Sequence, residues 1–341
     1  MQSYFWLYGV VVFFTSFLLT ALLRKYALSR SILDVPNSRS SHKVPTPRGG
    51  GVAIVLTFLL ALCALWLNAA ISADFAISLA GAGAVVAIIG FLDDHGHIAA
   101  RWRLLGHFFA AFWALWWMGG MPSVTIFNVT LSLGVLGYVF GALYLVWMLN
   151  LFNFMDGIDG IASIQALCTC IGGLLLYLCV DASASGLPSI VLAIAVAGFL
   201  VWNFPPARIF MGDAGSGFLG ITLGILSLQA AWISPALFWG WLILMGVFIV
   251  DATFTLIRRL ARGDKVYEAH RSHAYQFASR HYNSHRCVTL AVLAINVLWL
   301  MPLAGISVFY HLDGLSMTVL AYLPLIFIAF KFRAGELEKQ S

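Results

Sequence analysis

The stretch 131-LSLGVLGYVFGALYLVWML-149 runs directly into 150-NLFNFMDGIDG-160, and this junction decides the fold. The first part contains no charged residue and is close to the length of about 20 apolar residues that a helix needs to cross a membrane. The second part contains two asparagines and two aspartates. The junction therefore predicts a membrane-spanning helix that ends in a polar cluster at one membrane surface.

The composition extends this interpretation to the whole chain. Of its 341 residues, 61% are hydrophobic and 10% are charged, whereas soluble domains carry roughly 25% charged residues. A water-soluble globule is therefore excluded. The net charge is +5, but the basic residues fall between long apolar runs, so anionic lipid or phosphate is a better partner than nucleic acid. The five cysteines show no CxxC spacing, and we expect neither disulfides nor metal ligation from them.

Apolar runs long enough to span a membrane recur along the chain, and all 19 Lys and Arg residues fall in every second segment between these runs. If each run crosses the membrane, all of these residues lie on one side of it. Lys and Arg are enriched on the cytoplasmic side, so this separation predicts the orientation as well as the number of spans. We predict a single all-α, polytopic integral membrane domain over residues 1–341, with a periplasmic N-terminus and a cytoplasmic C-terminus. The eleven predicted spans are 3–23, 51–67, 75–92, 104–120, 131–149, 161–180, 188–204, 217–231, 235–257, 287–310 and 315–332. The predicted cytoplasmic loops are 24–50, 93–103, 150–160, 205–216 and 258–286.

Two adjacent carboxylates, Asp93 and Asp94, end the third predicted span. Neighbouring carboxylates repel each other and gain little from a hydrophobic helix end, so they suggest a bound cation or a proton-transfer task. A solvated helix terminus is the alternative. The residues alone leave the two interpretations evenly balanced.

The polar cluster after the fifth span contains Asn150, Asn153, Asp156 and Asp159, one every three positions. Asn150 and Asn153 can therefore share a helix face. A glycine follows each aspartate and permits the backbone to turn and to approach a ligand. Helix capping and solvation would explain one or two of these polar residues but not the whole set.

A third polar segment, 203-NFPPARIFMGDAGSG-217, joins the seventh and eighth spans and contains Asn203, Arg208, Phe210 and Asp213. Asp213 sits at a glycine-flanked turn before a helix, where free backbone N–H groups and a carboxylate could serve a phosphate and its metal together. Close helix packing is the alternative explanation for the glycines. It leaves Asp213 without an explanation.

Two basic loops complete the cytoplasmic side. The first, 34-DVPNSRSSHKVPTPRGGG-51, is either a positively charged tether or an anion-binding lip that uses Lys43 and Arg48. The second contains His270, Arg271 and His273, residue types that suit a phosphate-binding surface. A loop near anionic lipid is expected to be basic in any case.

Asp251 is a carboxylate inside the ninth predicted span. Pairing with a cation and exposure to a hydrated cleft are equally compatible with this position. Together, carboxylates for a divalent cation, basic groups for phosphate and a membrane body predict phosphoryl transfer onto a lipid, which depends on positioning and charge neutralisation.

These motifs resemble the polyprenyl-phosphate N-acetylhexosamine-1-phosphate transferases, the glycosyltransferase 4 type that includes MraY and WecA. The resemblance runs from Asp34 to about His273 and rests on several separate motifs. The WecA side looks closer, because the span count and the first loop agree better with it. Within it, the chain looks similar to the WbpL-type initiators of O-antigen synthesis. The motifs are DVPN…H…PTPRGGG, GFLDD, NLFNFMDGIDG, ARIFMGDAGS, the stretch 251–259 and the stretch 270–273.

The resemblance implies a reaction and a place for it. A UDP-activated N-acetylated sugar would donate its sugar-1-phosphate to undecaprenyl phosphate, releasing UMP and initiating a lipid-linked glycan of O-antigen or lipopolysaccharide. The protein would lie in the bacterial inner membrane with its active site facing the cytoplasm. Mg²⁺ would be the cofactor, with Mn²⁺ as an alternative. Whether the protein forms a homodimer stays open, as does the identity of the amino sugar.

The resemblance also implies roles for individual residues. Asp213, Asp93 and Asp94 would form the catalytic metal centre, and whether one of the adjacent pair acts as a base stays open. Asn150, Asn153, Asp156 and Asp159 would bind the nucleotide sugar, with Asn203 and Phe210 near the uridine. The remaining substrate-binding residues would be Lys43, Arg48, Arg208, His270, Arg271 and His273.

Two other classes of protein compete with an enzyme. The first is a multi-pass transporter of a phosphorylated or nucleotide-linked substrate, but transporters place their sites near the bilayer midplane, often within repeated halves. Here the carboxylates gather at one predicted surface, and the sequence shows no internal repeat. The second is a noncatalytic lipid-binding scaffold, which would show no Mg²⁺ dependence.

Overall fold

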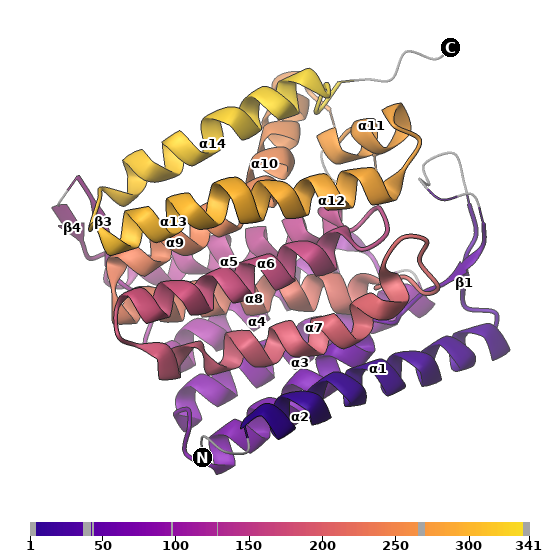
Figure 1. Ribbon diagram of the computed structural model, residues 1–341, viewed down its shortest axis with the longest axis horizontal. Helices are drawn as coiled ribbons and strands as arrows, with labels where there is room; N and C mark the ends of the chain where they lie inside the picture. The colour runs from indigo at the N-terminus through magenta and orange to yellow at the C-terminus, as the bar shows by residue number, and fades with distance from the viewer. Residues whose placement is uncertain are drawn as a thin grey trace.

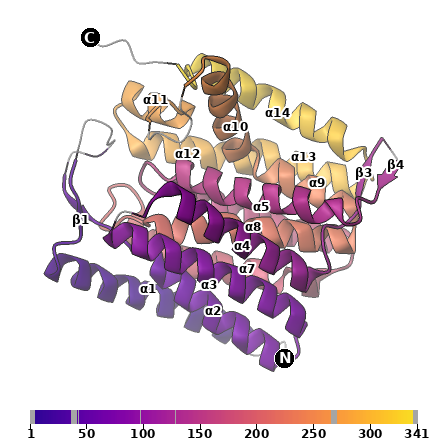
Figure 2. The same cartoon turned by 180° about the vertical axis from the view of Figure 1, so that it is seen from behind.

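The computed structural model describes residues 5–36, 42, 44–96, 98–127, 129–264 and 270–336. Most helices run side by side through the body of the molecule (Figure 1). The view from behind shows α3 and α4 in front of the central helices (Figure 2). The helical elements are α1 (Phe5–Ser29), α2 (Val52–Leu67), α3 (Ala73–His95), α4 (Ala100–Met118), α5 (Leu136–Met155), α6 (Ile161–Cys179), η2 (Ser183–Gly186), α7 (Leu187–Asn203), α8 (Asp213–Ile233), α9 (Pro235–Leu244), α10 (Gly246–Ala261), α11 (Ala274–His281), α12 (His285–Ile295), η3 (Asn296–Leu300), α13 (Met301–Phe309) and α14 (Gly314–Lys331).

Two small antiparallel hairpins, which the sequence did not predict, lie at opposite ends of the bundle (Figure 1). One pairs β1 (Leu33–Asp34) with β2 (Thr46–Pro47), and the other pairs β3 (Val124–Ile126) with β4 (Val129–Leu131). They are too short to change the fold class, which is all-α as predicted. The five cysteines are free, also as predicted.

Every predicted span coincides with a helix or with consecutive helices, which agrees with a polytopic membrane protein. In the described part of the chain, eight helices are long and apolar enough to cross a membrane, and a bent pair gives a ninth. Two predicted spans, which correspond to α2 and α4, are not long or apolar enough to count among these membrane-crossing helices. The helix α2 is apolar but has 16 residues, and α4 carries Arg101 and Arg103 in its first turn. The count of eleven and the orientation stay predictions.

The ninth predicted span, 235–257, is not one straight helix. It is broken into α9 and α10, whose axes differ by 72°. The break frees backbone groups that a continuous helix would pair, and the Gln165 side chain on α6 donates to the Leu244 carbonyl at 2.9 Å. Neighbouring side chains that pair freed backbone groups are what make such breaks tolerable inside a membrane. The bend turns α10 toward the same end of the bundle as α11 (Figure 1).

The helix α8 forms the centre of the bundle and packs between α3 and α5. Gly90 permits α3 to approach the backbone of α8 closely, since a Cβ at this position would lie 2.5 Å from the backbone nitrogen of Ala214. Asp94 is four residues further along α3, which places its carboxylate beside the first turn of α8. Close helix packing and the proposed site are therefore consequences of the same glycine.

Several predicted loops are shorter than expected because their polar residues belong to helices. The loop expected at 150–160 begins only at Asp156, because α5 continues to Met155. Within this helix the Asn150 amide donates to the Val146 carbonyl one turn back. The loop at 205–216 ends at Gly212, because Asp213 starts α8, where a negative charge is favoured by the helix dipole. The loop at 93–103 is reduced to the residues between α3 and α4, and the loop at 258–286 contains α11.

Candidate active site

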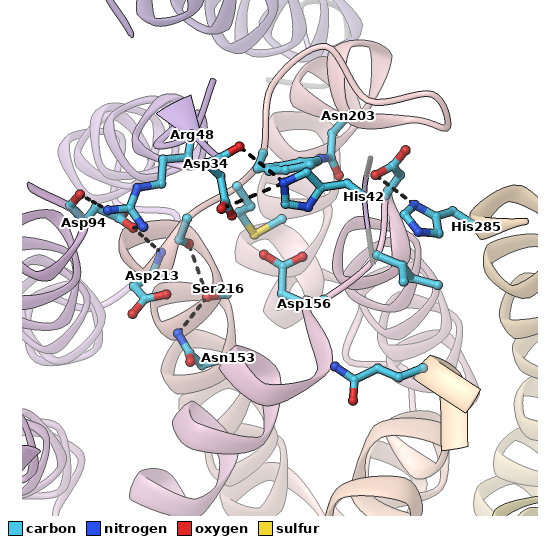
Figure 3. Close-up of a pocket in the computed structure, with 17 residues that line it drawn as sticks. Asp34, His42, Arg48, Asp94, Asn153, Asp156, Asn203, Asp213, Ser216 and His285 are labelled. Atoms are coloured by element: carbon cyan, nitrogen blue, oxygen red, sulfur yellow. Dashed lines mark hydrogen bonds and ion pairs between the residues drawn. The ribbon is translucent and has the colours of Figure 1, made fainter. Parts of the chain in front are cut away.

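A pocket of about 220 Å³ opens at the end of the bundle that carries β1 and α11. Figure 3 shows Arg48 and Asp94 on one side, His285 on the other, and Asp156 between them. Eight of the residues expected from the sequence line this pocket, namely Arg48, Asp94, Asn153, Asp156, Asp159, Asn203, Phe210 and Asp213. Asn150 and Asp93 line a small adjoining cavity that also includes Asn153 and Asp213. Lys43, and His97 near the aspartate pair, lie outside the described residues.

The carboxylate of Asp94 closes the start of α8. One oxygen accepts the backbone N–H of Asp213 at 3.2 Å, and the other accepts that of Ala214 at 3.4 Å. Asp94 is 4% exposed. The first N–H groups of a helix have no partner within the helix, so this buried carboxylate both satisfies them and fixes the orientation of Asp213.

Asp93 points to a different partner from its neighbour. It forms an ion pair with Arg103 on α4 and accepts the backbone N–H of Ile98 at 2.9 Å. The same guanidinium lies 3.6 Å from a carboxylate oxygen of Asp213. The three aspartates that the sequence predicted to act together are therefore brought to one place, and a basic residue that the sequence analysis used only for orientation connects two of them.

The asparagines of the 150–160 cluster have different surroundings. Asn153 donates to the hydroxyl of Ser216 at 3.1 Å, and this hydroxyl donates to the Gly212 carbonyl at 3.2 Å. Asn150 donates to its own helix. Both amides lie on one side of α5, as their spacing predicts, but only Asn153 lines the main pocket.

Asp156 ends α5 and lies in the middle of the pocket (Figure 3). Burial raises the pKa of this carboxyl well above its usual value, and three neighbouring carboxylates raise it further. These neighbours are Asp213, Asp94 and Asp159. A carboxyl group in this position ionises more easily when a cation binds beside it.

The far wall of the pocket is held by Asp159 and Asn203. Asp159 lies 3.1 Å from the His285 ring and accepts the backbone N–H of Ala207 at 2.9 Å. Asn203 is 2% exposed, accepts the N–H of Gly160 and donates to the Ile209 carbonyl. Asn203 therefore joins two loops of the pocket in addition to facing it.

The first loop forms the rim. Backbone hydrogen bonds from Phe210 to Pro47 and from Gly50 to Phe210, of 2.8 and 2.9 Å, join it to the segment before α8. Arg48 donates to the backbone carbonyl of Asp94, and its side chain, which lines the pocket, is 38% exposed. The His42 ring lies edge-on to the Phe210 ring with centroids 4.9 Å apart. The described part of this loop is thus a lip of the pocket rather than a free tether.

Besides Asn150, four described residues that were expected to bind substrate do not line the pocket. The Arg208 guanidinium lies over the Trp202 ring, 5.7 Å from its centroid. The backbone N–H of Arg208 also donates to the Trp202 carbonyl near the end of α7, which keeps the two residues together. His273 is 3% exposed and lies against Asp251. Burial lowers the pKa of His270 to about 3, so it is a neutral side chain rather than a phosphate-binding cation at neutral pH. Arg271 also lies outside the pocket lining.

Asp251 has partners within the protein, which are backbone N–H groups and the His273 ring. It accepts hydrogen bonds from the backbone of Ala274 and Tyr275 at the start of α11. The polar pocket side chains that received no role from the sequence are Asp34, His42, Ser216, Gln276 and His285. Asp34 and His42 belong to the quoted first-loop motif, and Ser216 lies about one helical turn after Asp213. His285 and Gln276 lie on α12 and α11, which no motif linked to the other residues.

The carboxylates of the pocket are hard oxygen donors, the type of ligand that Mg²⁺ prefers. Among the described residues, no three His, Cys, Asp or Glu side chains converge in a group that could hold a metal alone. Mg²⁺ usually takes one or two carboxylates and completes its shell with water and substrate phosphates. Asp213 is 38% exposed at the pocket, and Asp156 is crowded by carboxylates. These hard oxygen donors fit Mg²⁺ that is held jointly with a phosphorylated substrate.

Comparisons with known proteins agree with this chemistry. Residues 76–231 match the family model described as glycosyl transferase family 4. A probable undecaprenyl-phosphate N-acetylglucosaminyl 1-phosphate transferase of Bacillus subtilis (strain 168) is 29% identical over 305 residues, 85% of this chain and 81% of the relative. An undecaprenyl-phosphate alpha-N-acetylglucosaminyl 1-phosphate transferase of Thermotoga maritima is 28% identical over 307 residues, 88% of this chain and 87% of the relative. A phospho-N-acetylmuramoyl-pentapeptide-transferase of Thermotoga neapolitana is 32% identical over 216 residues, 60% of this chain and 68% of the relative. The chain belongs to glycosyl transferase family 4, the membrane phosphotransferases that move a sugar-1-phosphate onto a polyprenyl phosphate.

Proposed function

We propose that this chain transfers an N-acetylated sugar-1-phosphate from a UDP-sugar to undecaprenyl phosphate and releases UMP. The observation that carries the proposal is the meeting of Asp94, Asp156 and Asp213 with the cationic Arg48 in one pocket at the end of an apolar bundle. Such a pocket would hold a charged nucleotide beside the surface from which a lipid phosphate would approach. UDP-N-acetylglucosamine is the first donor to test, because the Bacillus subtilis and Thermotoga maritima relatives are named for this sugar.

The proposed reaction exchanges one bond to phosphorus for another. An oxygen of the lipid phosphate forms a bond to the sugar-bearing phosphorus, and the bond from that phosphorus to the UMP oxygen breaks. The acceptor needs no dedicated base, since the second pKa of a phosphomonoester is about 6. UMP leaves as an anion and keeps the electron pair of the broken bond.

The pocket residues would then act by positioning and by balancing charge. Mg²⁺, when bound, would neutralise the negative charge of the phosphate oxygens. We propose Asp213 as its main ligand, with Asp94 and Asp93 beside it. Asp94 would act chiefly through its hold on the first turn of α8. Arg48 would draw the anionic phosphates into the pocket.

The rest of the sequence-based assignment remains part of the proposal. Asn153, Asp156 and Asp159 would contact the nucleotide sugar, with Asn203 and Phe210 near the uridine. The site would face the cytoplasm of a bacterial inner membrane, and the product would initiate a lipid-linked glycan, O-antigen being the one favoured by the WbpL-type resemblance. Mn²⁺ is the alternative ion. The proposal is compatible with a monomer and with a homodimer.

The experiment uses detergent-purified protein, undecaprenyl phosphate, Mg²⁺ and a panel of UDP-N-acetyl sugars, with UMP and the lipid product measured together. Formation of both in equal amounts, and only with Mg²⁺ or Mn²⁺, is the expected result. Exchange of labelled UDP-sugar into sealed vesicles without UMP formation would favour the transporter. Lipid binding without either product would favour the scaffold.

A further inference from the structure

Asp251 is a buried carboxylate outside the pocket. It lies on α10, is 6% exposed and has its own set of donors. The backbone N–H groups of Ala274 and Tyr275 lie 2.9 and 3.0 Å from its oxygens, and the His273 ring nitrogen lies at 3.3 Å. These N–H groups open α11 and have no partner within that helix. Asp251 therefore fixes the start of α11 against α10.

Tyr275 extends this anchor to the end of α5. Its hydroxyl donates to the Phe154 carbonyl at 2.9 Å, and its side chain is buried. Phe154 belongs to the last turn of α5, where carbonyl groups also lack a helical partner. One buried carboxylate thus satisfies the start of α11, and one hydroxyl on α11 satisfies the end of α5.

Gly157 makes the approach of this hydroxyl possible. A Cβ at this position would lie 2.2 Å from the Tyr275 hydroxyl oxygen, which is closer than any side chain could tolerate. Between Phe154 and Gly157 lies Asp156, at the centre of the pocket. The next residue of α11, Gln276, also lines the pocket. Tyr275 on α11 therefore contacts the chain both before Asp156, at Phe154, and after it, at Gly157.

We propose that Asp251 and Tyr275 are positioning residues that hold Asp156 at the pocket wall and so set the affinity for the nucleotide-sugar donor without contacting it. The inference rests on the proposed function, in which Asp156 binds the donor. Small misplacement of a binding group is expensive, and about 1 Å can cost up to 100-fold in rate. Anchoring the last turn of α5 from a second helix restricts that misplacement.

The test compares Tyr275→Phe with Tyr322→Phe. Tyr322 is a matched control, because its buried hydroxyl also donates to a carbonyl on another helix, that of Leu242 at 2.7 Å, away from the pocket. We expect both variants to fold with similar small losses in Tm. We expect Tyr275→Phe alone to raise the donor KM about tenfold while leaving the undecaprenyl phosphate KM within twofold, and to speed hydrogen exchange at the amides of residues 155–160.

Asp251→Asn supplies a second route to the same answer. It removes one of the oxygens that accept the α11 N–H groups, so we expect the same rise in donor KM. Because Asp251 acts through Tyr275, the double variant should be little worse than the more affected single variant. If the rise in donor KM in the double variant equalled the product of the two single-variant rises, Asp251 would not act through Tyr275, and the proposal would be overturned.

Two further results would overturn the proposal. One is unchanged hydrogen exchange at residues 155–160 in Tyr275→Phe. The other is faster exchange with an unchanged donor KM, which would reduce the anchor to a stabilising contact. Failure of the proposed function is distinguishable from both, because the wild-type protein would then release no UMP. Binding of UMP, measured by calorimetry, would in that case replace the donor KM and decide the same question.

Discussion

Asp94 and Asp213 lie 119 positions apart in the chain, yet the carboxylate of the first accepts the backbone N–H of the second at 3.2 Å. This contact joins the end of α3 to the start of α8 and makes the orientation of one aspartate depend on the other. It also separates two roles that look identical in sequence. Asp94 is engaged with backbone, whereas the Asp213 carboxylate remains open to the pocket.

Asp213→Asn is expected to lower turnover by at least about 100-fold, because a neutral amide is a poor partner for Mg²⁺. The backbone N–H that bonds to Asp94 is retained in this variant, so the protein should insert and unfold at nearly the wild-type temperature. UMP release and a thermal unfolding curve measured on the same preparation check both statements. Near-normal activity would contradict the metal assignment.

The adjacent aspartates should both be needed for activity but should differ in stability. Asp94→Asn turns an acceptor oxygen into an N–H donor that faces the N–H groups of α8, which costs about 1–3 kcal/mol for a buried unsatisfied group. Asp93→Asn weakens a pair with the partly exposed Arg103, and about 1 kcal/mol or less is expected there. We expect severely impaired UMP release in each. Equal unfolding temperatures for the two variants would argue against the different roles of their carboxylates.

Arg48 and Arg208 were both expected to bind substrate, and the structure separates them. Arg48→Gln should raise the donor KM by about tenfold or more, since the proposed charge-assisted contact to phosphate would be lost. Arg208→Gln should leave the donor KM within twofold of the wild-type value, because the Arg208 guanidinium stacks on Trp202 outside the pocket. Steady-state kinetics at constant ionic strength measures both. A larger effect at Arg208 would return it to the substrate site.

His270 should make stability fall in acid. Its pKa is lowered from 6.5 to about 3 by burial, so the unfolded chain takes up a proton before the folded protein does. The stability that neutral His270 contributes is fully present above pH 6.5 and is lost as the pH falls from there toward 3. We expect His270→Gln to flatten the dependence of Tm on pH between 6.5 and 5 while changing UMP release at pH 7.5 by less than about threefold. Loss of activity in His270→Gln at pH 7.5, with wild-type Tm, would instead support the phosphate contact expected from the sequence.

The membrane fold follows from apolar runs that are nearly uninterrupted, and this local property is readable without any structure. The bend between α9 and α10 is not readable in this way. It depends on whether Gln165, 79 residues away, can pair the freed carbonyl of Leu244. The same limit applies to Arg103 and His285, which are ordinary basic residues until folding brings them to Asp93 and Asp159.

The histidine segment shows a second limit, since residue type alone does not reveal burial. His270 and His273 suit phosphate chemically, but burial keeps His270 neutral and His273 faces Asp251. Burial depends on what packs above a side chain, and α11 is amphipathic and short enough to have been assigned to a loop.

The sequence by itself determined that this protein lies in a membrane and which family it resembles, because hydrophobicity and motif spacing are properties of neighbouring residues. Only the tertiary structure decided which aspartate faces the pocket, which cations reach it and what Asp251 holds. Those outcomes depend on contacts between helices that are distant in the chain, such as the one Gly90 allows between α3 and α8. Hydrogen bonding and burial at such contacts give chemically identical side chains different tasks.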